Sequence, residues 1–139
     1  MANAPQSGYS GTPLVKKLGF KEGYRASYVN APEHFGELLG ELPDGVEVRA
    51  DLTGPLDLIV CFVTERRMLQ QRLKGLRRAM QTDGMLWIAW PKQSSGVETD
   101  VTEDVVREVT LPTGLVDTKV CAIDETWSGL RLVIRKELR

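Results

Sequence analysis

An almost uninterrupted apolar run at residues 56–63 is the feature that most restricts how this chain can fold. The run reads Leu-Asp-Leu-Ile-Val-Cys-Phe-Val, is rich in β-forming residues and contains one charged residue, Asp57. A strand of this composition is typical of a parallel sheet, which is covered on both faces. A second run of this kind spans residues 85–90 and ends at Pro91. The two runs therefore predict two buried strands.

A helical pattern separates these two runs. Leu69, Leu73, Leu76 and Met80 recur at helical spacing and give one apolar stripe. Thr64 suits the N-cap of this helix, and the Thr-Asp-Gly sequence that follows the stripe ends it. By the same criteria we expect helices at residues 12–18, at residues 33–42 and from residue 102 onward, and strands at residues 25–30, 46–50, 116–123 and 130–136.

This order of elements predicts an α/β fold, namely a single, mostly parallel twisted sheet with helices on both faces and a C-terminal antiparallel hairpin. Residues 1–11 are expected to be a flexible tail, and residues 12–139 one α/β domain. The strand at residues 46–50 fits less well, because only residues 51–55 separate it from the next strand. Five residues reach at most about 18 Å, too short to return over a full strand. We therefore expect this segment to pair antiparallel with residues 56–63 or to be a ragged edge segment.

Composition and charge exclude several classes of protein. The chain has 139 residues, of which 42% are hydrophobic and 27% charged, and its net charge is −1. These values indicate a globular protein and argue against a general nucleic-acid coat protein, although a local basic patch remains compatible with them. No apolar run approaches the roughly 20 residues that span a bilayer. We expect no membrane partner, and nucleic acid is a disfavoured partner.

Cysteine and histidine usage bears on metal sites and on cell compartment. Cys61 and Cys121 each lie in an apolar strand-like run, so we interpret both as buried thiols. The chain has no Cys-x-x-Cys motif and one histidine, which leaves too few ligands for a zinc site. The N-terminus lacks the charged and apolar regions of a signal peptide. A cytoplasmic protein without a metal is therefore expected.

The second half of the chain resembles a class I, Rossmann-like methyltransferase. The resemblance rests on the strand at residues 56–63, the Asp-Gly junction at residues 83–84 before the next strand, Gly114-Leu115, and the closing hairpin. It implies the fold of such an enzyme in truncated form. The glycine-rich cofactor turn of those enzymes is replaced here by residues 30–36, which include Pro32 and Phe35, so close approach of the backbone to a ligand is not supported. The resemblance thus implies the fold and counts against the activity.

Several short motifs are also similar to a family of short bacterial proteins that is known as a domain of unknown function. The motifs include Tyr-Ser-Gly-Thr-Pro-Leu at residues 9–14, Trp-Pro-Lys at residues 90–92 and Asp-Glu-Thr-Trp-Ser-Gly-Leu at residues 124–130. This resemblance covers almost the whole chain and implies no particular chemistry.

One set of candidate ligand-binding residues follows the predicted carboxyl ends of strands, where open α/β sheets place their ligands. The polar loop after Trp90 could hold an anion such as a phosphate, or it could be a solvated turn. His34 could act as a general base if a carboxylate oriented it, or it could be structural. Asp51 could take the place of the acidic residue that holds a ribose. The candidate residues are Pro32, His34, Asp51, Trp90, Lys92, Ser94 and Ser95.

A second set of candidates could bind a partner. In the helix at residues 65–80, Arg67, Lys74 and Arg78 lie opposite the leucine stripe, where they could bind nucleic acid or an acidic partner, or could simply be solvated. Trp127 is predicted in a hairpin loop, residues 124–129, where it could anchor an interface or cover the edge of the core. Trp87 is predicted in the core, with Trp90 on the opposite face of its strand.

The sequence contains no nucleophile elbow, no phosphate-binding Walker loop and no paired-carboxylate motif, and we assign no catalytic residue and no cofactor. We therefore expect a non-catalytic binding or regulatory protein that uses the cleft at the strand ends. One alternative is a divergent enzyme that binds S-adenosylmethionine or a nucleotide. A second alternative is a protein-interaction module that uses the arginine-rich helix or Trp127.

Overall fold

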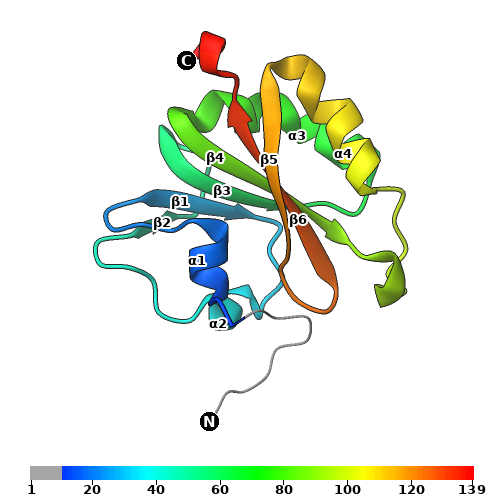
Figure 1. Cartoon of the computed structure of the whole chain (residues 1–139), viewed down its shortest axis with the longest axis horizontal. Helices are drawn as coiled ribbons and strands as arrows, with labels where there is room; N and C mark the ends of the chain where they lie inside the picture. Colours follow the sequence, from blue (N-terminus) through cyan, green and yellow to red (C-terminus); the bar gives the residue numbers. More distant parts are fainter. Residues whose placement is uncertain (1–10) are drawn as a thin grey trace.

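The structure, a computed structural model, describes residues 11–139; residues 1–10 of the expected tail lie outside the described range. One six-stranded sheet has the order β2-β1-β3-β4-β6-β5 (Figure 1). The first four strands in this order run parallel, and β6 runs antiparallel to both β4 and β5. The strands are β1 (Arg25–Val29), β2 (Glu47–Arg49), β3 (Leu56–Phe62), β4 (Met80–Pro91), β5 (Leu115–Ala122) and β6 (Trp127–Ile134).

Four α-helices connect and cover the strands. They are α1 (Leu14–Leu18), α2 (Phe35–Leu39), α3 (Arg66–Ala79) and α4 (Glu103–Thr110), and three short 3-10 helices, η1 (Gln93–Ser95), η2 (Leu111–Thr113) and η3 (Lys136–Leu138), follow β4, α4 and β6. The predicted fold class, a mostly parallel sheet with a closing antiparallel pair, is confirmed. Within residues 11–139, no helix has the length and apolar character needed to cross a membrane.

The two apolar runs form the middle of the sheet, as their composition requires. β3 and β4 are hydrogen-bonded neighbours, and nearly every side chain of β3 is buried. The exception is Asp57, whose carboxylate accepts a hydrogen bond from the backbone N–H of Arg25 at 2.8 Å. The leucine stripe of α3 lies over this part of the sheet, with Leu69 and Leu76 fully buried. A buried parallel pair joined by an amphipathic helix is therefore the centre of the fold.

The short strand β2 lies at the edge of the sheet and pairs parallel with β1. The expected edge position is confirmed, and the expected antiparallel pairing with residues 56–63 is wrong. In the register of the sheet, Arg49 of β2 pairs with Ser27 of β1, and Ser27 pairs with Ile59 of β3. To reach Leu56, the first residue of β3, the chain therefore has to cross β1 and move back along the strand direction by only three residues. That path is about 10 Å along the strands and about 10 Å across them. Residues 50–55 span it without a helix because β2 is so short.

Hydrophobic side chains fill both faces of the sheet as two clusters. One cluster joins α3 and α4 to alternate residues of the central strands, such as Ile59 and Ile88. The other joins α1 and α2 to the residues between them, such as Leu58 and Trp87. Figure 1 shows α1 and α2 on one side of the sheet and α3 and α4 on the other. The predicted cover on both faces is confirmed.

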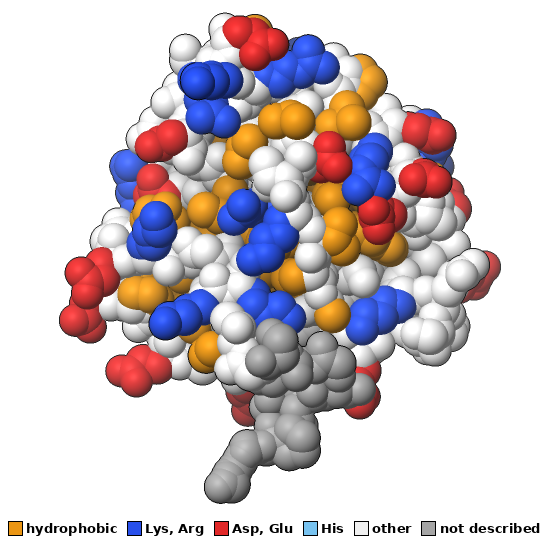
Figure 2. Space-filling view, in the orientation of Figure 1, with side chains coloured by type: hydrophobic (Ala, Val, Ile, Leu, Met, Phe, Trp, Pro, Cys, Tyr) orange, Lys and Arg blue, Asp and Glu red, His pale blue; other side chains and the backbone are white. Residues whose placement is uncertain are grey.

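The face that carries α1 leaves the β5–β6 side of the sheet open. Figure 2 shows hydrophobic side chains exposed among Lys and Arg side chains on this face. Val116 and Val120 of β5 are 38% and 45% exposed. Arg131 of β6 donates a hydrogen bond to the hydroxyl of Thr118 on β5 at 2.8 Å. The two five-residue helices α1 and α2 thus cover one side of the sheet less completely than α3 and α4 cover the other.

Element boundaries differ from the predictions in several places. β4 begins at Met80, so this residue of the predicted helical stripe and the Thr-Asp-Gly sequence after it lie in a strand. Trp127 is the first residue of β6 and pairs with Pro91, so the predicted loop at residues 124–129 is too long. Helix α3 begins after Glu65 rather than after Thr64, and α1 begins after Pro13 rather than at residue 12. The predicted start of the last helix at residue 102 is confirmed, and the Thr102 hydroxyl caps α4 by accepting a hydrogen bond from the backbone N–H of Val105 at 3.2 Å.

Candidate functional site

The carboxyl ends of β1 and β3 mark the place where a sheet of this order would bind a ligand. From β1 the chain moves outward to β2, and from β3 it moves the other way to β4, so the direction of connection reverses between them. In open α/β sheets, ligands bind outside the carboxyl ends of the strands at this reversal. The segments that follow the two strands, residues 30–34 and 63–65, therefore border the candidate site.

A row of five aromatic rings fills the space beside these strand ends. Phe35 of α2 is 1% exposed, and its ring centroid lies 5.0 Å from that of Tyr28 and 5.0 Å from that of Phe62. Trp127 continues the row beyond Phe62 at 5.0 Å, and Phe20 continues it beyond Tyr28 at 6.4 Å. All four contacts are edge-to-face, which is the favourable arrangement for aromatic rings. We call these residues the aromatic row.

Phe35 has the central place in this row because of its position in the chain. It is the first residue of α2, only six residues beyond the end of β1. Its ring is thereby turned back over the ends of both parallel strands, between Tyr28 of β1 and Phe62 of β3. Helix α2 has five residues, and its N-cap residue, His34, makes no side-chain capping hydrogen bond. The segment after β1 therefore supplies side-chain bulk where a phosphate-binding loop would supply backbone N–H groups.

His34 has an orienting carboxylate from the far end of the chain. Its Nε2 lies 3.0 Å from Oδ2 of Asp124, in the turn between β5 and β6. The His34 side chain is 51% exposed, whereas that of Asp124 is 16% exposed. The other carboxylate oxygen, Oδ1, accepts the backbone N–H groups of Thr126 and Trp127 at 2.9 and 2.8 Å. When Nε2–H of the neutral His34 ring donates its hydrogen bond to Asp124, Nδ1 of the same ring is left as an acceptor.

These contacts also set the electrostatics of the pair. Burial alone would raise the pKa of Asp124, but the hydrogen bonds from His34, Trp127 and Thr126 together lower the pKa below its ordinary value. In the aromatic row, burial raises the pKa of Tyr28 to about 12. The Tyr28 hydroxyl is buried and has no hydrogen-bond partner among the described residues. Asp124 is therefore ionised and acts as an anchor that holds His34 and the turn by hydrogen bonds. Tyr28 contributes to the aromatic row through its ring contacts.

The predicted anion loop lies next to this pair. The backbone N–H of Lys92 donates to the carbonyl of Thr126 at 2.7 Å, so His34 and Lys92 both contact the turn between β5 and β6. The Ser95 hydroxyl donates to the carbonyl of Lys92 at 2.7 Å and accepts the backbone N–H of Val97 at 3.1 Å. Ser94 is exposed in η1, and Pro32 is half-buried in the segment after β1. The hydrogen bonds of the Ser95 side chain therefore stay within its own turn, whereas Ser94 is exposed and Lys92 is half-buried.

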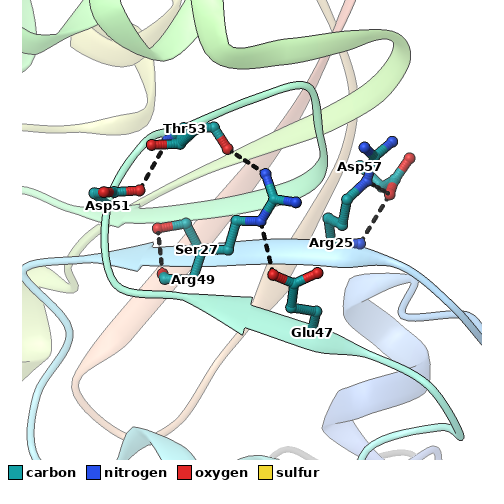
Figure 3. A network of polar contacts seen from close by, with 7 residues as sticks. All are labelled: Arg25, Ser27, Glu47, Arg49, Asp51, Thr53 and Asp57. Carbon is teal, nitrogen blue, oxygen red and sulfur yellow. Dashed lines mark hydrogen bonds and ion pairs between the residues drawn. The ribbon is translucent and has the colours of Figure 1, made fainter.

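Asp51 belongs to a different group of polar residues. Figure 3 shows it with Thr53, Arg49 and Glu47 around the link between β2 and β3. Asp51 Oδ1 accepts the backbone N–H of Thr53 at 3.1 Å, and the Thr53 hydrogen bonds lower the pKa of Asp51. Arg49 donates to the Thr53 carbonyl at 2.7 Å and to Glu47 at 3.0 Å. These contacts hold the short link in place, and the structure gives Asp51 no contact with His34 or Lys92.

The two strand tryptophans occupy opposite faces, as predicted. Trp87 is fully buried, and its indole Nε1 donates to the carbonyl of Leu18 at 2.8 Å. Trp90 is 6% exposed and belongs to the cluster under α3 and α4, away from the aromatic row. Cys61 and Cys121 are free, buried thiols, which confirms the sequence interpretation. Burial raises the pKa of Cys61 to about 12 and also raises that of Cys121.

The candidate partner-binding residues lie elsewhere on the molecule. Arg67, Lys74 and Arg78 are all exposed on α3. Of these, Lys74 lines a hollow of about 640 Å³ between α3 and α4. Trp127, half-buried at the end of the aromatic row, lies on a different side of the fold. Among residues 11–139, no group of three or more His, Cys, Asp or Glu side chains is placed to hold a metal ion.

Sequence reasoning missed Asp124 and the role of Phe35. Asp124 is separated from His34 by 90 positions, so no local pattern connects them. Its place before Glu-Thr-Trp is typical of an Asp that accepts backbone N–H groups of the following turn, and this signal could have identified it as an anchor. Phe35 was noted for its bulk, but its burial between Tyr28 and Phe62 depends on the strand order.

Comparisons with known proteins show a family match and a similarity of fold. Residues 37–136 match the family described as "Protein of unknown function (DUF3052)". No curated protein has significant similarity to the chain. Among solved structures, the fold is similar to that of a SAM-dependent methyltransferase from Aquifex aeolicus, with 17% identity, a TM-score of 0.61 and 87% of each chain covered.

Two further structures have the same fold. The N-methyltransferase NodS from Bradyrhizobium japonicum has 13% identity and a TM-score of 0.56, over 88% of this chain and 91% of that one. Fibrillarin from Aeropyrum pernix, in complex with S-adenosyl-L-methionine, has 15% identity and a TM-score of 0.55, over 91% of this chain and 70% of that one. The chain therefore has a methyltransferase-like fold.

Proposed function

Because the chain belongs to the DUF3052 family, whose function is unknown, we propose its role from its geometry: a non-catalytic binding or regulatory protein built on a methyltransferase-like fold. The observation that carries this proposal is the aromatic row across the ends of β1 and β3. Phe35, 1% exposed, packs its ring between Tyr28 and Phe62 near the strand ends at which sheets of this order bind ligands.

The residues around the strand ends do not fit an adenosyl cofactor. A dinucleotide-type turn uses glycines so that the backbone can approach the ligand, and a helix N-terminus to hold its negative charge. In this chain the turn carries Pro32 and Phe35, and α2 has only five residues. A ribose would also need an acidic partner, but Asp51 holds the turn at Thr53. No step of methyl transfer is therefore assigned to this chain.

Titration of the intact protein with S-adenosylmethionine and S-adenosylhomocysteine tests the proposal. A ligand at 100 times its dissociation constant adds about 2.7 kcal/mol to the free energy of unfolding. For a chain of 139 residues this amounts to a rise of about 9 °C in the melting temperature. We expect a shift below about 1 °C with either compound at 1 mM. A rise of several degrees in the melting temperature would mean that the protein binds the compound and would refute the proposal.

The His34–Asp124 pair favours a second candidate, an enzyme that binds a nucleotide or S-adenosylmethionine at the same edge. Asp124 orients the ring of His34 as a general base requires, at 3.0 Å, and Lys92 contacts the same turn. Because His34 is the single histidine of the chain, its imidazole NMR signals report on this site alone. Signals that move on addition of ATP or S-adenosylmethionine would support the enzyme, and unchanged signals would support the non-catalytic protein.

The anion site predicted at Lys92, Ser94 and Ser95, with Pro32, His34 and Trp90 nearby, stays a prediction. The exposed Ser94 and the ammonium group of Lys92 support it, whereas Ser95 and Trp90 are committed to internal contacts. Inorganic phosphate is the simplest probe. Backbone amide signals of residues 92–96 that move with phosphate in the wild type, and not in Lys92→Ala, would establish the site.

A further inference from the structure

Helix α3 concentrates positive charge in a protein that is slightly acidic. Its 14 residues contain six Lys and Arg side chains and no Asp or Glu, while the whole chain has a net charge of −1. The leucine stripe of α3 is buried against the sheet, so the cations occupy the remaining faces of the helix. A helix of this kind presents a local positive potential that the composition of the chain conceals.

One side of α3 borders the hollow of about 640 Å³ between α3 and α4. We call this hollow the α3–α4 groove. Arg66, Lys74 and Arg77 lie along its α3 side, and the buried Leu73 and half-buried Val109 give it an apolar floor. A smaller hollow of about 470 Å³ shares Glu108 with the groove and adds Leu111, Pro112 and two further cations, Arg107 and Arg135. The groove therefore combines an apolar floor with a cationic rim.

Internal contacts pair Arg66 with a carboxylate and use one nitrogen of Arg77, the cations at the two ends of the groove. Arg66 pairs with Glu108 across it at 2.8 Å, and Nε of Arg77 donates to the carbonyl of Thr113 at 3.2 Å. Lys74 lies between them along the helix and is exposed. Its ammonium group has no hydrogen bond or ion pair with any other residue of the range 11–139. The centre of the rim is thus an uncompensated positive charge above an apolar floor.

We propose that the α3–α4 groove binds an acidic segment of a partner protein, with one apolar side chain of that segment on the floor formed by Leu73 and Val109. The proposal deepens the proposed function, since it names the partner of a non-catalytic protein and rests on that role. Charge complementarity requires carboxylates opposite Lys74 and Arg77. The apolar floor requires a hydrophobic anchor between those carboxylates, as in other peptides that bind between helices.

The chemistry of the groove favours a peptide over a nucleic acid. Single-stranded nucleic acids bind to cationic surfaces that also offer aromatic rings for stacking. The residues that line the two hollows include no aromatic side chain, and the aromatic row lies at the strand ends instead. A Leu and Val floor matches an aliphatic or aromatic side chain of a peptide. A phosphate backbone would gain nothing from it.

Fluorescence anisotropy with defined probes tests the proposal on the intact protein. The probe is a labelled 12-residue peptide that has Glu and Asp around one central Leu. The comparison probes are the same peptide with Ser at the centre and a single-stranded oligonucleotide of 12 thymidines. We expect the Leu peptide to bind at least about tenfold more tightly than either comparison probe. Equal binding of the Ser peptide or of the oligonucleotide would overturn the proposal.

Two charge reversals on α3 locate the contact. Lys74→Glu changes the groove rim, and Arg72→Glu makes the same change of charge on the other side of the leucine stripe, outside the residues that line the groove. Both positions are exposed, so both variants should fold. We expect Lys74→Glu to weaken binding of the Leu peptide about tenfold or more, and Arg72→Glu to weaken it less than twofold. Equal losses of affinity in the two variants would mean that the peptide is attracted by positive charge in general, and would refute binding in the α3–α4 groove.

Amide chemical-shift mapping separates the failure of this inference from the failure of the proposed function. The Leu peptide should move signals of residues 66–77 and 108–113, and S-adenosylmethionine should move none. Signals that move around residues 28–35 with S-adenosylmethionine would refute the proposed function while leaving the groove intact. Peptide-induced shifts that avoid residues 66–77 would refute the groove alone.

Discussion

The substitution Phe35→Ala tests most directly whether the Phe35 ring is packed at the ends of β1 and β3. It removes a ring that is 1% exposed and in edge-to-face contact with Tyr28 and Phe62. Deletion of a buried Phe ring costs about 3–5 kcal/mol of unfolding free energy, because burial is lost and a cavity remains. The entropy of unfolding of a 139-residue chain is about 0.29 kcal/mol per kelvin at the midpoint. The melting temperature should therefore fall by about 10–17 °C.

Circular dichroism melts and urea titrations of the wild type and of Phe35→Ala measure this difference. Gly36→Ala is the matched control, because Gly36 is exposed in the same helix and a Cβ there would contact nothing within 4 Å. A Gly to Ala change in a helix should leave the stability unchanged or raise it by up to about 1 kcal/mol. A fall below about 3 °C for Phe35→Ala would refute the reasoning, since the ring would then not be packed between the two strand ends.

Three further predictions follow from buried or paired groups. Trp87→Phe leaves the Leu18 carbonyl without its indole donor at 2.8 Å and should lower the free energy of unfolding by about 1–3 kcal/mol, measured by urea titration; an unchanged midpoint would contradict the buried hydrogen bond. Asp124 has a pKa below its ordinary value of 3.8, so its carboxylate stabilises the fold above that pH, and the contribution is lost as the pH falls through the lowered pKa. Asp124→Asn should therefore destabilise the protein at pH 7, with a difference from the wild type that shrinks below pH 3.8; a difference that is constant with pH would exclude the ionised anchor. The pKa of Cys61 is about 12, so the native protein should react with a thiol reagent at pH 8 only on the timescale of unfolding; rapid labelling would mean that the strand is accessible.

The central part of the fold could be predicted because its signals are local. The apolar runs at residues 56–63 and 85–90 and the helical stripe between them specify β3, α3 and β4 without reference to the rest of the chain. The parallel pairing of β2 with β1 could not be obtained in this way. It depends on the shortness of β2, which is three residues long and exposes Val48 at 45%. A strand with so little burial has almost no hydrophobic pattern of its own.

The candidate site was predicted only in part, because it is assembled from distant segments. The loops after β1 and β4 were identified from the rule that ligands bind at strand ends, and His34 and Lys92 do contact one common turn. Which carboxylate would orient His34 could not be predicted, since Asp124 comes from the last hairpin. Trp90 was grouped with Lys92 because the two are neighbours in sequence, yet its side chain belongs to the cluster under α3 and α4.

The two edges of the sheet differ in how they resist pairing with another copy of the protein. An unpaired edge strand exposes a row of backbone donors and acceptors to any extended chain, and short, charged edges resist this best. β2 is such an edge, with three residues that include Glu47 and Arg49. β5 has eight residues and exposes Val116 and Val120, but its register is interrupted between Asp117 and Lys119. That irregularity, together with the lysine in the middle of the strand, is the barrier to edge-to-edge aggregation along β5.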